Sequence, residues 1–200
     1  ANGAEVKMLA TDLEVGLRSK CTATVSKGGS LTLPAKKLYE IIKALPETDV
    51  RIEEDRGGVK VAADRFDSRM QTLPREDFPQ MSAGNLPHRF NLAAADLIAL
   101  IEKTRFAIST EETRFYLNGI YLHAIKESKA SRLRAVATDG HRLARHELDL
   151  PEGARDIPGV IVPRKTVAEL RRLLEDAEGV IEIGLSDTKV QFSFNGVELT

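Results

Sequence analysis

Cysteine is almost missing from this 200-residue sequence, which has only Cys21. One cysteine excludes an intramolecular disulfide framework and favours a reducing compartment. No apolar run approaches the roughly 20 residues that a membrane helix needs. The N-terminus also lacks the basic-then-apolar order of a signal peptide. These absences predict a cytoplasmic protein without a membrane segment.

Motifs for catalysis and metal binding are missing as well. The sequence has no Gly-rich phosphate loop and no Gly-x-Ser-x-Gly nucleophile turn. His141 and His146 are five residues apart, which predicts opposite faces of one strand, and no third ligand follows at metal-site spacing. We therefore expect no catalytic residue, no metal and no cofactor. A metal-independent enzyme using Asp139 and the two histidines remains an alternative.

An excess of positive charge is absent too. The sequence has 29 Lys and Arg against 30 Asp and Glu, for a net charge of −1. A protein that holds DNA by bulk electrostatics is usually basic. If DNA is the partner, the cations must therefore be gathered on particular faces.

What the sequence does contain is a repeat. Ala10-Thr11-Asp12 recurs as Ala137-Thr138-Asp139, and from Pro34 onward similar residues recur 129 positions later. The matched pairs are Pro34 with Pro163, Lys36 with Lys165, Leu38 with Val167, Ile41 with Leu170, Lys43 with Arg172 and Leu45 with Leu174. A collinear series of apolar and basic positions predicts two domains of one fold.

Small and turn-forming residues at 82–87 mark the boundary between the copies. We predict a first domain over 1–82, a linker over 83–88 and a second domain over 89–200. The second copy is expected to open with a helix over 92–109, with Asn91 as its N-cap. The first copy has no room for that helix, so we expect it to be truncated at its start.

The remaining pattern predicts an α+β fold, with short helices on antiparallel sheets. Pro34 and Pro163 precede amphipathic stretches at 35–45 and 164–175, as expected for proline at a helix start. Asp139-Gly140 lies between apolar runs and predicts a hairpin of strands 132–137 and 141–148. The segments 59–66 and 189–194 each read as a strand.

Both predicted helices carry their cations opposite the apolar arc, some in the first turn. There the helix dipole disfavours a cation by about 0.3–1 kcal/mol. An ordinary solvated surface would explain the cations on either helix taken alone. Cations at matching positions on two equivalent helices instead favour a repeating polyanion as the binding partner. The cations are Lys36, Lys37, Lys43, Arg164, Lys165, Arg171 and Arg172, with Lys103 and Arg105 flanking the expected 92–109 helix.

A regulator that reads DNA sequence is a further alternative. Such a protein presents Asn, Gln or Arg at base-reading positions of a recognition helix. The predicted basic faces here carry only Lys and Arg. They therefore favour phosphate contacts over base contacts.

Five segments carry a resemblance to a known family. The second copy contains Val-Ala-Thr-Asp-Gly-His-Arg-Leu-Ala at 136–144, Arg-Phe-Tyr-Leu-Asn-Gly at 114–119 and Val-Ile-Val-Pro-Arg-Lys at 160–165. The first copy contains Ala-Thr-Asp-Leu-Glu at 10–14 and Leu-Pro-Arg-Glu-Asp-Phe-Pro at 73–79. In order and spacing they resemble the β subunits of bacterial DNA polymerase III, the DNA sliding clamps.

The resemblance implies a non-enzymatic processivity factor of bacterial replication, associated with the nucleoid. In that family each chain has three domains of the DNA-clamp fold. Two chains form a head-to-tail homodimeric ring, with helices lining the hole, sheets outside and double-stranded DNA within. A third domain is absent from this sequence, which we expect to be part of a longer protein. The implied partners are replicative and repair polymerases and the clamp loader, which bind through short peptides.

The resemblance also implies two sets of site residues. One wall of the peptide groove would consist of Arg114, Leu117, Thr138, Gly140, His141, Arg142 and Leu143. Phe115 and Tyr116 resemble an aromatic pair on the family's DNA-facing surface. Phe115 lacks the hydroxyl often found there, and a place in the core is the alternative for it. The alternative for Gly140 and His141 is a plain hairpin turn.

Overall fold

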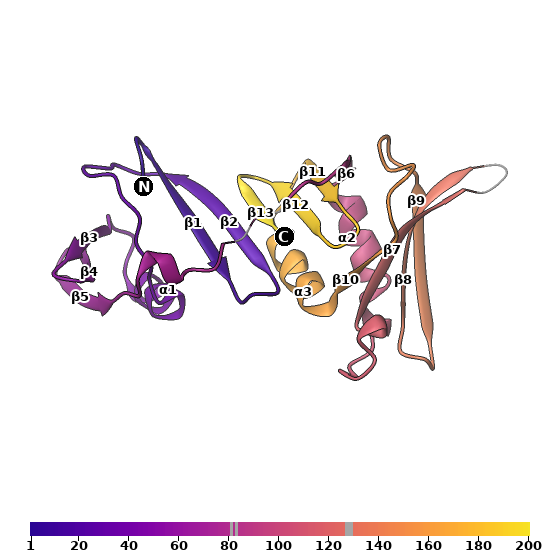
Figure 1. Ribbon diagram of the computed structural model, residues 1–200, viewed down its shortest axis with the longest axis horizontal. Helices are drawn as coiled ribbons and strands as arrows, with labels where there is room; N and C mark the ends of the chain where they lie inside the picture. Colours follow the sequence, from indigo (N-terminus) through magenta and orange to yellow (C-terminus); the bar gives the residue numbers. More distant parts are fainter. Residues whose placement is uncertain (81, 83, 127–129) are drawn as a thin grey trace. The chain divides into compact units, whose positions relative to one another are not determined.

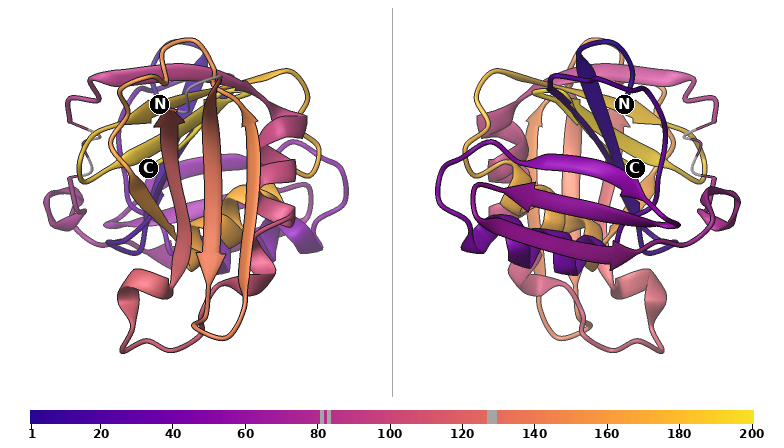
Figure 2. Two further views of the ribbon diagram at one scale, coloured as in Figure 1. Left: turned by 90° about the vertical axis from the view of Figure 1, so that its right-hand side faces the viewer. Right: turned by 90° about the vertical axis from the view of Figure 1, so that its left-hand side faces the viewer.

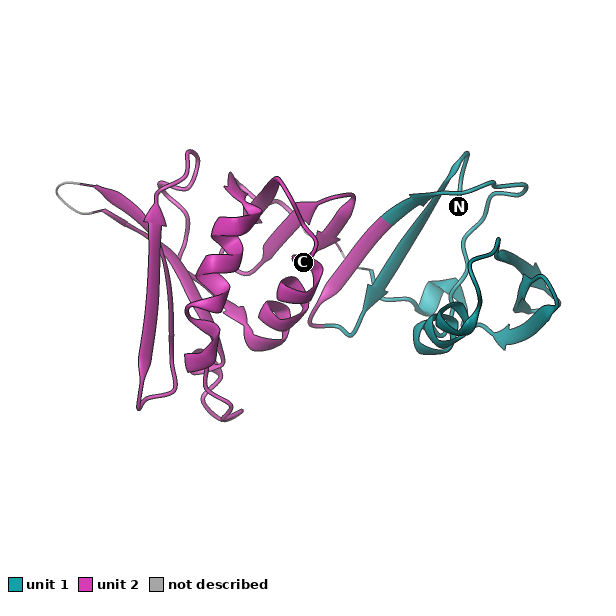
Figure 3. Cartoon of the chain, turned by 180° about the vertical axis from the view of Figure 1, so that it is seen from behind, with its two compact units in different colours: residues 1–13, 20–81 teal, residues 14–19, 82–200 magenta. Residues whose placement is uncertain are grey.

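The computed structural model describes residues 1–80, 82, 84–126 and 130–200. The chain divides into two compact units, one of residues 1–13 and 20–81 and one of residues 14–19 and 82–200 (Figure 3). The predicted linker includes Ala83, which lies outside the described residues. No helix in the described part of the chain is long and apolar enough to cross a membrane.

The first sheet of the second unit is antiparallel, with the strand order β10-β7-β8-β9 (Figure 2). Its strands are β7 (Gly119–Lys126), β8 (Ser131–Thr138), β9 (Leu143–Asp149) and β10 (Val160–Pro163). Side chains alternate between its faces, so Leu133 and Ala135 are buried while Arg134 between them is half-buried. One face is therefore apolar and the other carries charge.

A second antiparallel sheet in this unit has the order β6-β11-β12-β13. β13 also pairs with residues 17–19 of β2 (Gly16–Thr22), which belong to the same unit. The other strands are β6 (His88–Ala93), β11 (Val180–Leu185), β12 (Val190–Phe194) and β13 (Val197–Leu199). Ile181 and Ile183 of β11 are fully buried.

Two helices lie between these sheets, α2 (Ala94–Glu102) and α3 (Arg164–Leu173) (Figure 1). Leu97 and Leu100 of α2 share one apolar core with Val167 and Leu170 of α3 and with strand residues of both sheets. Pro163 is the N-cap of α3, as the sequence predicts. The core therefore fixes which side of α3 is exposed.

The first unit contains α1 (Ala35–Ala44), N-capped by Pro34, and an antiparallel sheet in the order β3-β4-β5 (Figure 2). The elements are β1 (Glu5–Thr11), the end of β2, β3 (Arg51–Asp55), β4 (Gly58–Ala63), β5 (Phe66–Gln71) and the 3-10 turn η1 (Arg75–Asp77). Its buried cluster is small, with Val59, Val61 and Met70 at the centre. None of the ten described residues of α1 is buried.

The repeated order of elements predicted from the sequence is present. Shifted by 129 residues, α1 coincides with α3, and each helix precedes a three-stranded antiparallel meander, β3-β4-β5 or β11-β12-β13. Shifted by 127 residues, β2 coincides with β9. The two units thus repeat one α+β arrangement of antiparallel sheets and short helices.

The predicted helix over 92–109 is wrong at both ends. Leu92 and Ala93 belong to β6, where they pair with β11, so the helix begins at Ala94 and its N-cap is Ala93 instead of Asn91. It ends at Glu102, after which the buried Thr104 hydroxyl donates a hydrogen bond of 2.6 Å to the Leu100 carbonyl. Strand pairing and this local bond override the helical pattern.

The predicted strand over 59–66 is also wrong, because it contains a hairpin turn. β4 ends at Ala63 and β5 begins at Phe66. Asp64 turns the chain with φ of 45°, in the left-handed region that Asp tolerates better than most residues. The two short strands pair with each other in antiparallel register.

Candidate functional site

The β8–β9 turn is held by a dense set of local hydrogen bonds. The Thr138 hydroxyl donates to the Arg142 carbonyl at 2.7 Å and accepts from the Gly140 amide at 3.1 Å. One Asp139 oxygen accepts from the amides of His141 and Arg142, each at 3.0 Å. Gly140 has φ of 92°, which glycine adopts without strain. The predicted hairpin is therefore present, but its second strand begins at Leu143 instead of His141, because these hydrogen bonds hold His141 and Arg142 in the turn.

The carboxyl group of Asp139 makes the stability of this turn depend on pH in the acid range. Hydrogen bonds from the Arg142 and His141 amides lower the pKa of the Asp139 carboxyl to about 2. Because this value is below the roughly 3.9 of an unfolded aspartate, the carboxylate contributes stability above pH 4. That contribution is lost as the pH falls from about 4 toward 2. A carboxyl-carbon NMR titration should show Asp139 still ionised at pH 3, and titration near 3.9 would contradict this turn geometry.

The segment before β7 approaches the same turn. Phe115, Tyr116 and Leu117 form the 3-10 turn η3 (Phe115–Leu117), and Arg114 is its N-cap. A Cβ on Gly140 would lie 3.5 Å from the Arg114 guanidinium, so this side chain reaches the β8–β9 turn. Leu117 is half-buried, and its carbonyl accepts a hydrogen bond from the Ser109 amide at 3.1 Å.

Phe106 adds an aromatic side chain that the sequence motifs did not indicate. It lies in the 3-10 turn η2 (Arg105–Ala107) and is 58% exposed. The Arg142 guanidinium carbon lies 5.8 Å from the centre of its ring, a cation–π geometry. No motif or spacing in the sequence distinguishes Phe106, because the burial of its neighbours Ala107 and Ile108 is known only from the structure.

The Leu117 amide donates a hydrogen bond to the Arg114 carbonyl at 2.8 Å. Together these contacts link all seven predicted groove residues and Phe106 into one area, which we name the turn surface. It consists of Phe106, Arg114, Leu117, Thr138, Gly140, His141, Arg142 and Leu143. Leu143 is 64% exposed, and His141 and Arg142 are also exposed. An exposed leucine and phenylalanine beside two guanidinium groups can bind an apolar peptide and hydrogen-bond its carbonyls.

Phe115 and Tyr116 are both at the surface, 77% and 56% exposed, with ring centres 5.6 Å apart in an edge-to-face arrangement. The alternative that Phe115 belongs to the core is therefore wrong. Two exposed rings on a 3-10 turn are available to a partner.

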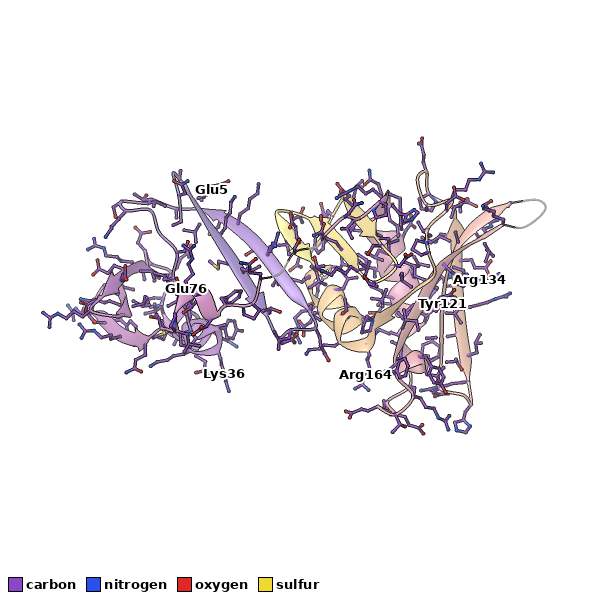
Figure 4. The ribbon with its side chains drawn as sticks, in the orientation of Figure 1. Glu5, Lys36, Glu76, Tyr121, Arg134 and Arg164 are labelled. Carbon is purple, nitrogen blue, oxygen red and sulfur yellow. The ribbon has the colours of Figure 1, made fainter. Side chains whose placement is uncertain are left out.

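The cations of α3 are exposed, but most are paired with carboxylates. Arg171 Nε lies 2.8 Å from Glu102, Arg172 lies 3.3 Å from Glu169, and Lys165 lies 3.4 Å from Glu14. Arg164 differs, because among the described residues no carboxylate lies within ion-pair distance of it. Its side chain projects from the start of α3 (Figure 4).

In the first unit, Lys36, Lys37 and Lys43 are exposed on α1, and Lys36 projects from the ribbon in Figure 4. Lys43 Nζ lies 5.6 Å from the centre of the Tyr39 ring. The two cations near α2 differ from each other. Arg105 is paired with Glu102 at 2.9 Å, whereas Lys103 is exposed at the helix C-cap.

Histidine chemistry finds little support in the geometry. His141 lies in the turn before β9 rather than on the strand, so it does not share a strand with His146. His123 is stacked on Tyr121 with ring centres 4.4 Å apart, and burial, followed by the charge of Arg134, lowers the pKa of His123. Within the described ranges, no group of three His, Cys, Asp or Glu side chains is placed to hold a metal.

Comparison with known proteins gives one family over the whole chain. The model of the DNA polymerase III beta subunit, central domain, matches residues 91–200, and that of its N-terminal domain matches residues 1–82. A beta sliding clamp of Caulobacter vibrioides is 46% identical over 205 residues, covering 100% of this chain and 55% of that protein. One of Pseudomonas aeruginosa is 39% identical, covering 94% of this chain and 51% of that protein.

Solved structures agree with these relatives. A sliding clamp from Bartonella birtlesii bound to griselimycin has a TM-score of 0.96 at 41% identity, covering 100% of this chain and 54% of that one. Caulobacter crescentus pol III beta also has a TM-score of 0.96, at 47% identity and the same coverage. The fold is thus that of a sliding clamp, in the α+β class predicted from the sequence.

The chain belongs to the family of bacterial DNA polymerase III beta subunits, which confirms the resemblance seen in the sequence motifs. It spans about half the length of the curated relatives it matches, 55% in the Caulobacter protein.

Proposed function

We propose that this chain provides the first two domains of a ring-forming, non-catalytic processivity factor. In this proposal the full-length protein includes a third domain, and two copies form a ring that encircles duplex DNA in the bacterial cytoplasm. The domain limits proposed are 1–82 and 89–200. The observation that carries the proposal is the match to sliding clamps along the whole chain.

The cationic helices support contact with DNA that does not depend on sequence. Lys36 of α1 and Lys165 of α3 occupy the same position of the repeated arrangement, as do Lys43 and Arg172. Lysine and arginine on exposed helix faces, with no Asn or Gln among them, suit phosphates better than base edges. Topology would supply processivity, while weak phosphate contacts allow sliding.

The turn surface supports the second part of the proposal, which is docking of partners. Replicative and repair polymerases and the clamp loader would each insert a short apolar peptide there. The exposed Leu143 and Phe106 supply apolar area, and Arg114 and Arg142 supply donors. The opposing wall of the groove would come from the third domain.

Charge reversal on the helices tests the DNA contact in the full-length protein. The double variant Lys36→Glu and Arg164→Glu should shorten retention on circular duplex DNA, with an effect that is the same for any sequence. Each cation that no longer binds a phosphate should reduce the dependence of log K on log salt by about 0.9. The control reverses Arg56 and Arg155, which are exposed in turns and match the net charge change.

If both double variants were retained on DNA equally long, the cations of α1 and α3 would be ordinary solvated surface residues without a role in DNA contact. Retention that depends on one DNA sequence would favour the alternative of a sequence-reading regulator. An activity that survives in the purified protein and disappears on replacing Asp139 or His141 would favour the enzyme alternative.

A further inference from the structure

A single carboxylate connects the end of α2 with the exposed face of α3. Glu102 is the last residue of α2. Its Oε2 accepts a hydrogen bond from Arg105 Nε at 2.9 Å, and its Oε1 accepts one from Arg171 Nε at 2.8 Å. Each oxygen therefore has its own guanidinium partner, one nearby in sequence and one 69 residues away.

The electrostatics of this cluster keep it ionised. The hydrogen bond from Arg171, followed by that from Arg105, lowers the pKa of Glu102. Glu102 in turn raises the pKa of Arg171. A second carboxylate, Glu175, lies 3.7 Å from Arg171 on the next turn of α3. Glu102 and its two arginines thus carry a net charge of one where two free guanidinium groups would carry two.

The geometry divides the cations on this side of the unit into two kinds. Arg164 has no carboxylate within ion-pair distance among the described residues, so its charge is available to a phosphate. Arg105 and Arg171 would have to leave a well-aligned carboxylate before they could bind one. Such an exchange has much less effect on counterion release than binding by a free cation, because the Glu102 charge remains beside the phosphate.

We propose that Glu102 is a positioning residue that holds Arg105 and Arg171 away from DNA, so that Arg164 contacts phosphates there in place of these two arginines. This inference deepens the proposed DNA contact and rests on it. Weak holding matters because a clamp must slide, and every additional phosphate contact makes movement along DNA slower. Glu102 would therefore limit the strength of the DNA contact without contacting the DNA itself.

The test measures how the affinity of the 200-residue chain for a short random-sequence duplex depends on salt, by fluorescence anisotropy. In Glu102→Gln and Glu102→Ala, Arg105 loses its carboxylate partner and Arg171 keeps only Glu175, at 3.7 Å. The slope of log K on log salt should therefore become steeper by about 1. Adding Arg105→Ala and Arg171→Ala to Glu102→Gln should restore the wild-type slope. Glu182→Gln is the matched control, since it frees Arg89, the partner of Glu182 in β6, and changes the net charge equally.

The outcomes separate this inference from the proposed function. If Arg164→Glu flattens the slope while neither Glu102 variant changes it, the DNA contact stands and the inference is overturned. A lower melting temperature with an unchanged slope would make Glu102 a structural brace only, which also overturns it. If the slope of the wild type is near zero and Arg164→Glu has no effect, the proposed DNA contact fails and the inference fails with it. An equal increase in Glu182→Gln would reduce the effect to net charge and overturn the inference as well.

Discussion

Replacing Leu170 by alanine is expected to lower the free energy of unfolding of the second unit by about 2–5 kcal/mol. Leu170 is only 1% exposed and belongs to the core that α3 shares with α2 and both sheets. Removing its side chain leaves a cavity that surrounding strands close only in part. Urea unfolding followed by far-ultraviolet circular dichroism gives the change in midpoint and slope.

Ile41→Ala is the matched control, because Ile41 occupies the position in α1 that Leu170 occupies in α3. Ile41 is half-buried, and none of the ten described residues of α1 is buried. Its replacement should therefore cost less, about 1 kcal/mol, in line with partial burial of a few methylene groups. Equal costs at the two positions would show that the helices are packed alike and that the difference in burial has no energetic weight.

The sequence predicted the repeat, but it did not predict that α1 and α3 differ in burial. The 129-residue spacing predicted two equivalent helices, and α1 and α3 coincide under that shift. Their burial depends on what packs against them. α2 covers α3 in the second unit, whereas the described part of the first unit contains no counterpart of α2.

The predicted ends of helices and strands were wrong where tertiary contacts compete with the local sequence pattern. Leu92 and Ala93 satisfy the period of a helix, but their pairing with Ile181 and Val180 places them in β6. Strand pairing between segments so far apart in the sequence has no local signal. Asp64 shows the opposite case, a local turn residue inside a segment that the sequence analysis assigned to a single strand.

The candidate site was predictable in its residues and not in its contacts. The motif segments indicated Arg114, Leu117 and the 138–143 turn, and the approach of Arg114 to Gly140 brings them together. Phe106 escaped because one exposed aromatic in a helical pattern has no distinguishing signal. The pairing of Glu102 with Arg171 was not predicted for another reason. Ion pairs between distant segments depend on side-chain geometry, which the periodicity of the sequence does not give.

In the full-length protein, Leu143→Lys or Leu117→Lys should weaken the binding of partner peptides by at least about thirtyfold. That factor corresponds to a loss of about 2 kcal/mol, typical of a central apolar anchor in an interface. Leu143 is 64% exposed, so lysine there leaves the fold intact, while Leu117 is half-buried and carries a greater risk to stability. The measurement is titration of a labelled peptide of the Gln-Leu-x-Leu-Phe type, with melting curves recorded for each variant.

Val180→Lys is the control, because Val180 is 60% exposed in β11 of the same unit and lies outside the turn surface. Phe106→Ala should reduce affinity through loss of apolar area and of the ring beneath Arg142, which lies 5.8 Å away.

The 200-residue chain should bind the same peptide far more weakly than the full-length protein, because the proposed groove needs a wall from the third domain. Tight and equal binding by both would place the groove elsewhere. Unchanged affinity in both leucine variants would remove the turn surface as the docking site, whatever becomes of the DNA contact, because the two proposals depend on different residues.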